Sequence, residues 1–281
     1  MSSPDTGVAD RMRAALAHGA GLLDVVPTGR PLAWGWRGRT IGAQVIRADQ
    51  RPAWLRVLSA LPGKRDERIW SGTEQAAALV PDSVPRPVLI GQSDWTTPEA
   101  VYRAELTSYI PSPALSAEPV LRTDLDLPDA WWSSLRASLG MIAATPTQRQ
   151  AVTPAYIERA LPLYLRSPQL PTRVPRWSTA HGDLHWANLT ASGPTLLDWE
   201  GWGLAPAVYD IALLAAHTML VPATEGRLRA EFADLLDSTE GRFAELVVLA
   251  ELLQTTTRGD NLDLAPALHR RAAELIPLSP A

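Results

Sequence analysis

The sequence predicts an α+β fold, with a small antiparallel sheet in the first part of the chain and mainly helices in the second. Before residue 107, short β-prone runs alternate with turn residues, and one helical segment lies among them. From Pro128 onward, apolar residues recur mostly with the spacing of an α-helix. The stretch Ile110–Pro113, with two prolines and a serine, follows the last predicted strand and marks a boundary. We therefore expect one part over residues 1–106 and a second over residues 107–281.

The first part is expected to contain two helices and five strands. An apolar spacing that includes Met12 and Leu16 predicts a helix that ends before Pro27, and Pro81 ends the second helix. Gly, Arg, Asp and Pro turn residues separate the strands. In chain order we expect a helix at Asp10–Leu23, strands at Leu32–Trp34, Thr40–Ile46 and Ala53–Leu58, a helix at Asp66–Val80, and strands at Val88–Ile90 and Val101–Leu106.

The second part is expected to contain six helices and two short strands. One helix has a clear start, because Thr153 suits the N-cap and Pro154 the first helical position. The expected helices are Pro128–Ala143, Thr153–Tyr164, Pro206–Leu220, Glu225–Leu236, Phe243–Thr256 and Ala265–Ile276, and the expected strands are Ser178–Ala180 and Thr195–Leu197. The two strands lie on either side of the most polar motif of the chain.

Composition narrows the class of protein. The chain has 281 residues, 46% of them hydrophobic, which is enough for one large core or two smaller ones. A net charge of −4 gives no basic surface for nucleic acid, and the absence of cysteine excludes disulfides and thiolate metal sites. No signal-peptide pattern and no apolar run of about 18 residues is present. We expect a soluble, cytoplasmic protein with no membrane partner; the composition leaves the oligomeric state open.

Five polar residues stand out between short apolar runs: His181, Asp183, Asn188, Asp198 and Asp210. Asp183 and Asn188 have the D-x-x-x-x-N spacing of a kinase catalytic loop, in which the Asp accepts a hydroxyl proton and the Asn holds Mg²⁺. Asp198 ends a short apolar strand, where a second metal ligand is needed. An Asx turn with helix capping would explain the first pair, but it would not explain Asp198.

Three motifs in this order carry a family resemblance: HGDLHWAN at His181–Asn188, LDWE at Leu197–Glu200, and DIA at Asp210–Ala212. Together they resemble the aminoglycoside phosphotransferase and choline kinase family, which are small-molecule relatives of protein kinases. The resemblance implies a two-lobed protein-kinase-like fold, with a nucleotide-binding N-lobe and a C-lobe that holds the catalytic loop and the substrate site. It also implies transfer of the γ-phosphate of ATP or GTP to a small-molecule hydroxyl, with Mg²⁺ as cofactor.

The resemblance assigns roles to the polar residues. Asp183 would orient the acceptor hydroxyl and take its proton, and Asn188 and Asp198 would hold Mg²⁺ through oxygen atoms. Asp210 would accept backbone N–H bonds from the catalytic loop, although it could also be a plain helix cap. His181 would brace the loop by hydrogen bonds. His181 and His185 also have a helical metal-binding spacing, so a zinc-dependent hydrolase that uses both with Asp183 is an alternative.

The first part of the chain departs from the family. Arg56 occupies the place of the phosphate-binding lysine, and its planar fork keeps the positive charge with a different geometry. We expect Glu74 on the following helix to pair with Arg56, with Glu67 as the second choice. Glu74 also has capping-box spacing from Ser71, so it could simply start that helix. Lys64, the only lysine of the chain, could contribute from a loop.

Two further features remain open in the sequence. The segment GWRGRTIG at Gly35–Gly42 is either a plain hairpin turn or a lid over phosphates. Near the motifs, Trp186, Trp199 and Trp202 either pack the core or hold a cation or a sugar.

The acceptor and the class of function are less defined. Glu200, Trp202 and His185 are the candidates for contacts with an acceptor, which could be an aminoglycoside-like antibiotic, a sugar, an amino alcohol or a natural-product intermediate. The alternative function is a non-catalytic nucleotide- or small-molecule-binding protein on the same scaffold. The replacement of the lysine by Arg56 motivates that alternative.

Overall fold

The computed structural model describes residues 5–276, which fold into two compact units. The first unit comprises the described residues up to Ala78 together with Arg86–Ser112. The second comprises Leu79–Pro85 and the described residues from Pro113 onward. Each unit has its own apolar core, because the two main clusters of buried hydrophobic residues belong to different units.

The first unit is built on an antiparallel sheet with the strand order β1-β3-β4-β6-β5, to which β2 adds by pairing with β3. The strands are β1 (Val25–Pro27), β2 (Ala33–Trp34), β3 (Thr40–Arg47), β4 (Pro52–Ala60), β5 (Leu89–Thr96) and β6 (Val101–Ser108). The five predicted strands are present. The sequence analysis missed β1, because a three-residue strand is too short to show alternation.

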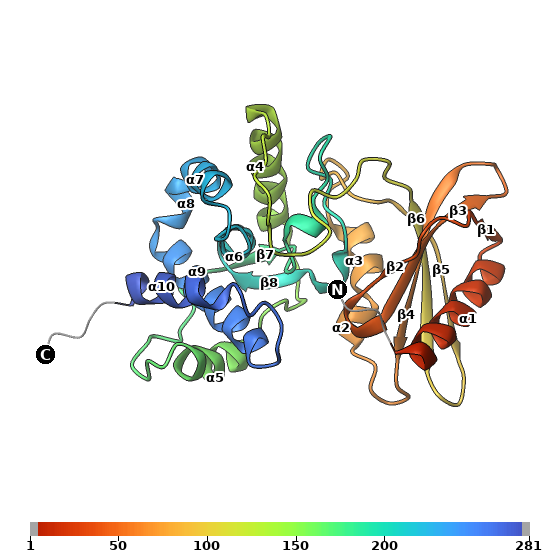
Figure 1. Cartoon of the computed structure of the whole chain (residues 1–281), viewed down its shortest axis with the longest axis horizontal. Helices are drawn as coiled ribbons and strands as arrows, with labels where there is room; N and C mark the ends of the chain where they lie inside the picture. The colour runs from red at the N-terminus through yellow and green to blue at the C-terminus, as the bar shows by residue number, and fades with distance from the viewer. Residues whose placement is uncertain (1–4, 277–281) are drawn as a thin grey trace, which may run out of the picture. The chain divides into compact units, whose positions relative to one another are not determined.

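The two faces of this sheet differ in chemistry. Side chains along a strand alternate between faces, so Leu55 and Val57 of β4 point to one face and Arg56 points to the other. Helix α1 (Thr6–Leu22) covers the apolar face, where Met12 joins Leu55 and Val57 in one buried cluster. Figure 1 shows α1 on one side of the sheet, and α2 (Glu67–Trp70) and α3 (Gly72–Leu79) on the other. The face that bears Arg56 is therefore the one next to α2 and α3.

The single helix predicted over Asp66–Val80 is two helices, α2 (Glu67–Trp70) and α3 (Gly72–Leu79). Asp66 caps α2, because its carboxylate accepts a hydrogen bond from the backbone of Arg68 over 3.0 Å. Ser71 is the C-cap of α2, and its hydroxyl donates to the Glu67 carbonyl over 2.8 Å. The capping box of Ser71 with Glu74 stays a prediction.

The second unit is mainly helical and is centred on α9 (Thr239–Thr256). Four consecutive residues of α9, at positions 247–250, are buried, so this helix is covered on all sides. Helices α5, α6 and α10 pack against it. The other helices of the unit are α4 (Asp129–Ala144), α5 (Pro154–Tyr164), α6 (Tyr209–Ala216), α7 (Pro222–Glu231), α8 (Ala233–Leu236) and α10 (Ala265–Leu275).

A two-stranded antiparallel sheet, β7 (Trp177–Ala180) with β8 (Gly203–Pro206), encloses the polar motif. The predicted strand at Thr195–Leu197 is only an isolated bridge between Leu196 and Leu189. The helix predicted from Pro206 begins at Tyr209, because Pro206 still belongs to β8 and Val208 has a left-handed φ of 73°.

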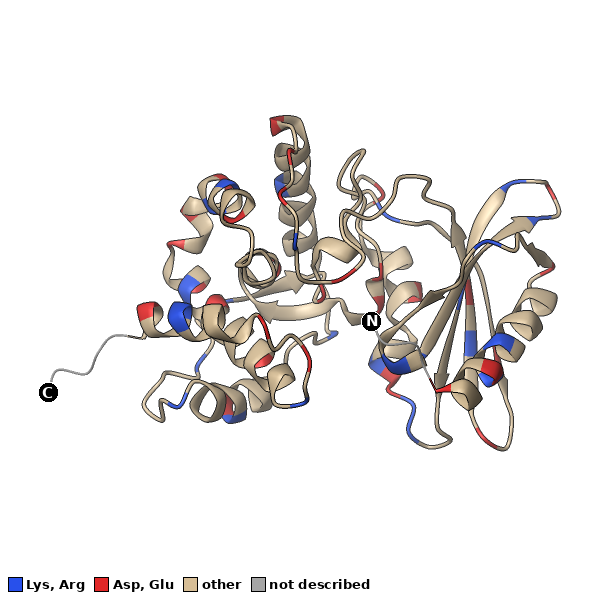
Figure 2. Cartoon of the chain, in the orientation of Figure 1, with Lys and Arg blue, Asp and Glu red and all other residues tan. Residues whose placement is uncertain are grey.

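Charged residues of both signs are mixed along the helices and loops of each unit (Figure 2). None of the helices within residues 5–276 combines the length and apolar character that crossing a lipid bilayer requires.

Candidate active site

Asp183 and Asn188 lie in the loop that follows β7. The chain turns at Gly182, whose φ of 82° suits glycine, and a Cβ there would lie 2.6 Å from the Gly201 carbonyl oxygen. The loop ends in a short 3₁₀ helix at Trp186–Asn188. Asn188 Nδ2 donates to the Asp183 carbonyl oxygen over 2.9 Å and lies 3.5 Å from the Asp183 carboxylate. The loop therefore brings the predicted proton acceptor and the predicted metal ligand side by side.

Asp210 anchors this loop from the first turn of α6. Its two carboxylate oxygens accept the backbone N–H groups of His181 over 2.7 Å and Gly182 over 2.9 Å. The resemblance implied such bonds, and they are present. Burial raises the pKa of Asp210, and the positive charge of His181 together with the two backbone hydrogen bonds opposes this rise. One buried side chain thus fixes the backbone immediately before Asp183.

Asp198 is held next to the loop of Asp183 and Asn188 through the residue that precedes it. The Leu197 N–H donates to the Asn188 carbonyl over 2.9 Å, and the Leu197 carbonyl accepts a hydrogen bond from His181 Nε2, also over 2.9 Å. Asp198 itself has a left-handed backbone, with φ 60° and ψ 74°. Such a conformation costs a non-glycine residue about 1 kcal/mol or more, and it is concentrated at functional sites.

The Asp183 carboxylate is accessible and strongly acidic. Its side chain is 49% exposed, and His185 Nε2 lies 3.6 Å from its Oδ2. The partial burial of the Asp183 side chain raises its pKa, but hydrogen bonding to His185 and the electrostatic effect of the neighbouring histidines outweigh this and lower the pKa to about 2. The carboxylate is therefore ionised at neutral pH and weakly basic, which suits it better to orienting a hydroxyl than to deprotonating it in advance.

His217 supports His185 from the end of α6. It is 4% exposed, its Nδ1 donates to the Leu213 carbonyl over 3.0 Å, and its ring meets the ring of His185 edge-on at 5.7 Å. Burial, and to a smaller extent the electrostatic effect of His185, lower the pKa of His217 to about 3, although Asp183 and the Leu213 carbonyl oppose this change. His217 is therefore a neutral imidazole at physiological pH.

This buried histidine predicts a loss of stability in mild acid. The pKa of His217 is about 3 in the folded protein and near its ordinary value of 6.5 in the unfolded chain, so only the unfolded chain takes up a proton between these values. Between pH 7.5 and pH 5 we expect His217 to remove about 2 kcal/mol from the free energy of unfolding. Urea unfolding at both pH values measures this. His217→Gln should reduce the pH dependence, whereas the exposed control His269→Gln should not. If the free energy of unfolding depended equally on pH in wild type and in His217→Gln, the assignment of His217 as a buried neutral imidazole would be wrong.

The three tryptophans near the motifs are packed inside the second unit. Trp186 and Trp202 are 0% exposed and Trp199 is 4% exposed. Trp186 Nε1 donates to the Thr218 hydroxyl over 2.9 Å, and the Arg149 guanidinium lies over the Trp202 ring at 5.3 Å. Core packing is thus the role the structure gives these rings. Protein atoms cover Trp202, so an acceptor would not reach it in this conformation.

Glu200 and His185 are placed differently. Glu200 is half-buried in the short 3₁₀ helix Trp199–Gly201, while His185 contacts both Asp183 and Asn188. Among the described residues, no group of three or more His, Cys, Asp and Glu side chains could hold a metal ion. His181 Nε2 also faces a backbone carbonyl. The zinc hydrolase alternative therefore gains no support.

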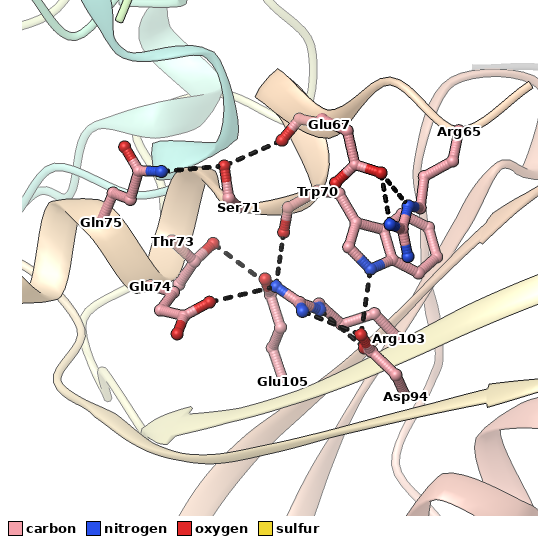
Figure 3. A network of polar contacts seen from close by, with 10 residues as sticks. All are labelled: Arg65, Glu67, Trp70, Ser71, Thr73, Glu74, Gln75, Asp94, Arg103 and Glu105. Carbon is pink, nitrogen blue, oxygen red and sulfur yellow. Dashed lines mark hydrogen bonds and ion pairs between the residues drawn. The ribbon is translucent and has the colours of Figure 1, made fainter. Parts of the chain in front are cut away.

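In the first unit, Arg56 lies in the middle of the central strand β4, where it is half-buried and directly opposite Gly42 on β3 and Glu105 on β6. Glu74, the carboxylate predicted to pair with Arg56, forms an ion pair with Arg103 of β6 at 3.5 Å (Figure 3). The pairing of Arg56 with Glu74 stays a prediction.

The other candidates of the first unit lie apart from this network or at its edge. Glu67 forms an ion pair with Arg65, and Lys64 is exposed in the turn between β4 and α2. The Gly35–Gly42 segment makes a short 3₁₀ turn between β2 and β3. At its tip Trp36 is 51% exposed, with the Arg37 guanidinium over its ring at 4.4 Å. Whether this segment covers phosphates stays a prediction.

Several supporting residues were not found from the sequence. Leu197 acts through its backbone, and Thr218 and His217 reach the loop from another helix. No local pattern marks such contacts, because they depend on how distant segments pack.

Comparison with known proteins adds independent evidence. Residues 113–246 match the model of the phosphotransferase enzyme family. No curated protein sequence matches the chain significantly. Among solved structures, an amicoumacin kinase in complex with AMP-PNP and Ca²⁺ matches with a TM-score of 0.60 at 11% identity, over 96% of this chain and 95% of that chain. The aminoglycoside phosphotransferase APH(4)-Ia matches with 0.60 at 13% identity, over 96% and 98%. A macrolide 2′-phosphotransferase from Brachybacterium faecium matches with 0.52 at 15% identity, over 97% and 100%.

At these identities the solved structures establish the fold, and they confirm the prediction of a kinase-like fold with an antiparallel sheet and a helical part. The family match covers the stretch that holds Asp183, Asn188, Asp198 and Asp210. The chain therefore has the fold of the antibiotic phosphotransferases, and its residues 113–246, which hold the three motifs, match the model of the phosphotransferase enzyme family.

Proposed function

We propose that this protein is a small-molecule kinase that transfers the γ-phosphate of ATP or GTP to a hydroxyl group. One observation carries the proposal: Asp183 and Asn188 lie together in a loop that Asp210 anchors, and Leu197 holds Asp198 beside that loop. Structural relatives support it, because one was solved with AMP-PNP and another with ADP and hygromycin B.

In this proposal Asp183 receives the acceptor hydroxyl. Its ionised carboxylate accepts the hydroxyl hydrogen bond and points the oxygen at the γ-phosphorus. As the new O–P bond forms, the bond from the γ-phosphorus to the bridging oxygen breaks, and the hydroxyl proton passes to Asp183. Because the transition state of phosphoryl transfer is loose, positioning contributes more than basicity, which agrees with the low pKa of Asp183.

Asn188 and Asp198 would hold Mg²⁺. The side-chain nitrogen of Asn188 makes the hydrogen bonds to Asp183 and His185, so its side-chain oxygen is left to face a cation. An amide oxygen and a carboxylate suit Mg²⁺, which is usually bound by one or two protein oxygens together with phosphates and water. When bound, the ion would neutralise charge on the phosphates.

Arg56 would bind phosphate oxygens from the central strand of the first unit. A guanidinium donates two parallel hydrogen bonds to an anion, whereas a lysine acts as a point charge. The acceptor we propose is a small molecule with a free hydroxyl: an aminoglycoside-like antibiotic, a sugar, an amino alcohol or a natural-product intermediate. Glu200, two residues after Asp198, is the carboxylate we assign to an amino group of such an acceptor.

A thermal melt with Mg·ATP and Mg·GTP tests the nucleotide site. A ligand at about 100 times its Kd adds roughly 2.7 kcal/mol of stability, which raises the melting temperature measurably. We expect a Mg²⁺-dependent rise in wild type with at least one nucleotide, and its loss in Asp198→Ala. Asp237→Ala removes an exposed carboxylate from the same unit and should keep the rise. If neither nucleotide shifts the wild type, the proposal fails and a non-catalytic binding protein explains the scaffold better.

A further inference from the structure

The register of the first sheet pairs Arg56 with a second acidic residue. Arg56 of β4 lies directly opposite Glu105 of β6 in the antiparallel ladder. Directly opposite residues point to the same face, with Cβ atoms about 4.5–5.5 Å apart, and opposite charges in this position stabilise each other. The strand pairing itself thus sets a carboxylate next to the phosphate-binding arginine that we propose.

Glu105 is unusual because it is a buried carboxylate. It is 2% exposed, and its Oε2 accepts a hydrogen bond from the Thr73 hydroxyl of α3 over 3.1 Å. A buried charge is costly unless cations and hydrogen-bond donors surround it. Two arginines on the same face of the sheet supply positive charge near Glu105: Arg56 lies across the strand pair, and Arg103 lies two residues before Glu105.

Arg103 already interacts with two other carboxylates, those of Asp94 and Glu74. Its Nε and Nη2 donate to Asp94 over 2.7 and 2.9 Å, its Nη1 donates to the Trp70 carbonyl over 2.8 Å, and Glu74 lies 3.5 Å away. Figure 3 shows Arg103 between Asp94 and Glu74, with Glu105 beside it. Glu74 of α3 is therefore engaged with Arg103, while Glu105 lies opposite Arg56 in the sheet.

We propose that Glu105 is the positioning carboxylate for Arg56, and that Glu74 with Arg103 forms a separate contact that fastens α3 to β6. This inference rests on the proposed nucleotide function. In this arrangement the strand register places the backbone of Glu105 opposite that of Arg56, and the Thr73 hydroxyl of α3 holds the Glu105 carboxylate. The longer arginine suits a partner on the neighbouring strand, because its fork can face Glu105 with one edge and phosphate oxygens with the other.

Glu105→Gln tests the inference by calorimetric titration. The glutamine keeps the size of the side chain and an oxygen for Thr73, but removes the charge. We expect Mg·ATP to bind about tenfold more weakly, as an effect of about 1.4 kcal/mol gives. Binding of adenosine, which has no phosphate, should change less than about twofold on the same scale. If wild type prefers GTP, then Mg·GTP and guanosine replace these probes. Glu105→Asp should recover part of the loss.

Two further variants make the outcome decisive. Glu99→Gln, an exposed carboxylate in the turn between β5 and β6, should leave both titrations unchanged. Glu74→Gln removes the competing carboxylate, and a larger loss of Mg·ATP affinity there than in Glu105→Gln would overturn the inference. Unchanged or tighter binding of Mg·ATP by Glu105→Gln would also overturn the inference. The same holds if Glu105→Gln weakened the binding of adenosine as much as that of Mg·ATP. Failure of wild type to bind any nucleotide would instead refute the proposed function.

Discussion

Asp183→Asn is expected to lower turnover by about 10³-fold while Mg·nucleotide binding is kept, because a positioned acid or base contributes roughly 10²–10⁴-fold. The asparagine removes the negative charge that orients the acceptor hydroxyl and receives its proton. The loop should keep its shape, because Asn188 donates to the backbone carbonyl of residue 183 and Asp210 holds the backbone before it. Single-turnover transfer of the γ-phosphate to an acceptor hydroxyl, with thermal melts for nucleotide binding, separates the two effects.

The matched control for Asp183→Asn is Asp126→Asn, which changes a carboxylate elsewhere in the same unit. It should retain full turnover. If Asp183→Asn kept wild-type turnover, the assignment of Asp183 as the residue that receives the hydroxyl would be wrong. If it lost nucleotide binding as well, the residue would instead contribute to the metal site.

Asp210→Ala is expected to lower the free energy of unfolding by about 3 kcal/mol, because each unsatisfied buried N–H costs about 1–3 kcal/mol. Two such groups, on His181 and Gly182, lose their acceptor. The turn at Gly182 then loses its anchor, and a shift of about 1 Å in a catalytic group can cost about 10²-fold in rate. The free energy of unfolding, measured with urea, and the turnover rate should therefore both decrease.

Asp129→Ala is the matched control for this variant. Asp129 also lies in the first turn of its helix, but its side chain is 94% exposed and pairs with Arg227. An exposed pair contributes less than about 1 kcal/mol, so Asp129→Ala should change neither measurement much. Equal effects of the two substitutions would mean that Asp210 acts only on the helix dipole.

The parts of the fold that the sequence predicted are those with local patterns. Alternating apolar residues and turn residues located β3, β4 and β6, and helical spacing located the long helices. The short strands β1 and β8 were missed because neither shows a clear alternation, and only pairing with distant partners defines them. The start of α6 was misplaced because Pro206 belongs to a strand in the structure.

The same division applies to the candidate site. Asp183 and Asn188 lie five residues apart in one loop, so their spacing alone predicts that they meet. The partner of Glu74 could not be predicted in this way. The helix break at Ser71, the register of β6 and the position of Arg103 together decide which cation it reaches. A single sequence does not show which of several similar charged residues, distant along the chain, will form an ion pair.

The placement of Arg56 and Lys64 bears on how this protein can be detected chemically. Amine-reactive nucleotide analogues label proteins by acylating a lysine next to the bound phosphates. Here the central strand offers a guanidinium, and the single lysine side chain is exposed in the turn between β4 and α2. Under the proposed nucleotide function, a survey that identifies nucleotide-binding proteins by such labelling would pass over this one, whereas a photoreactive nucleotide that does not need an amine would capture it.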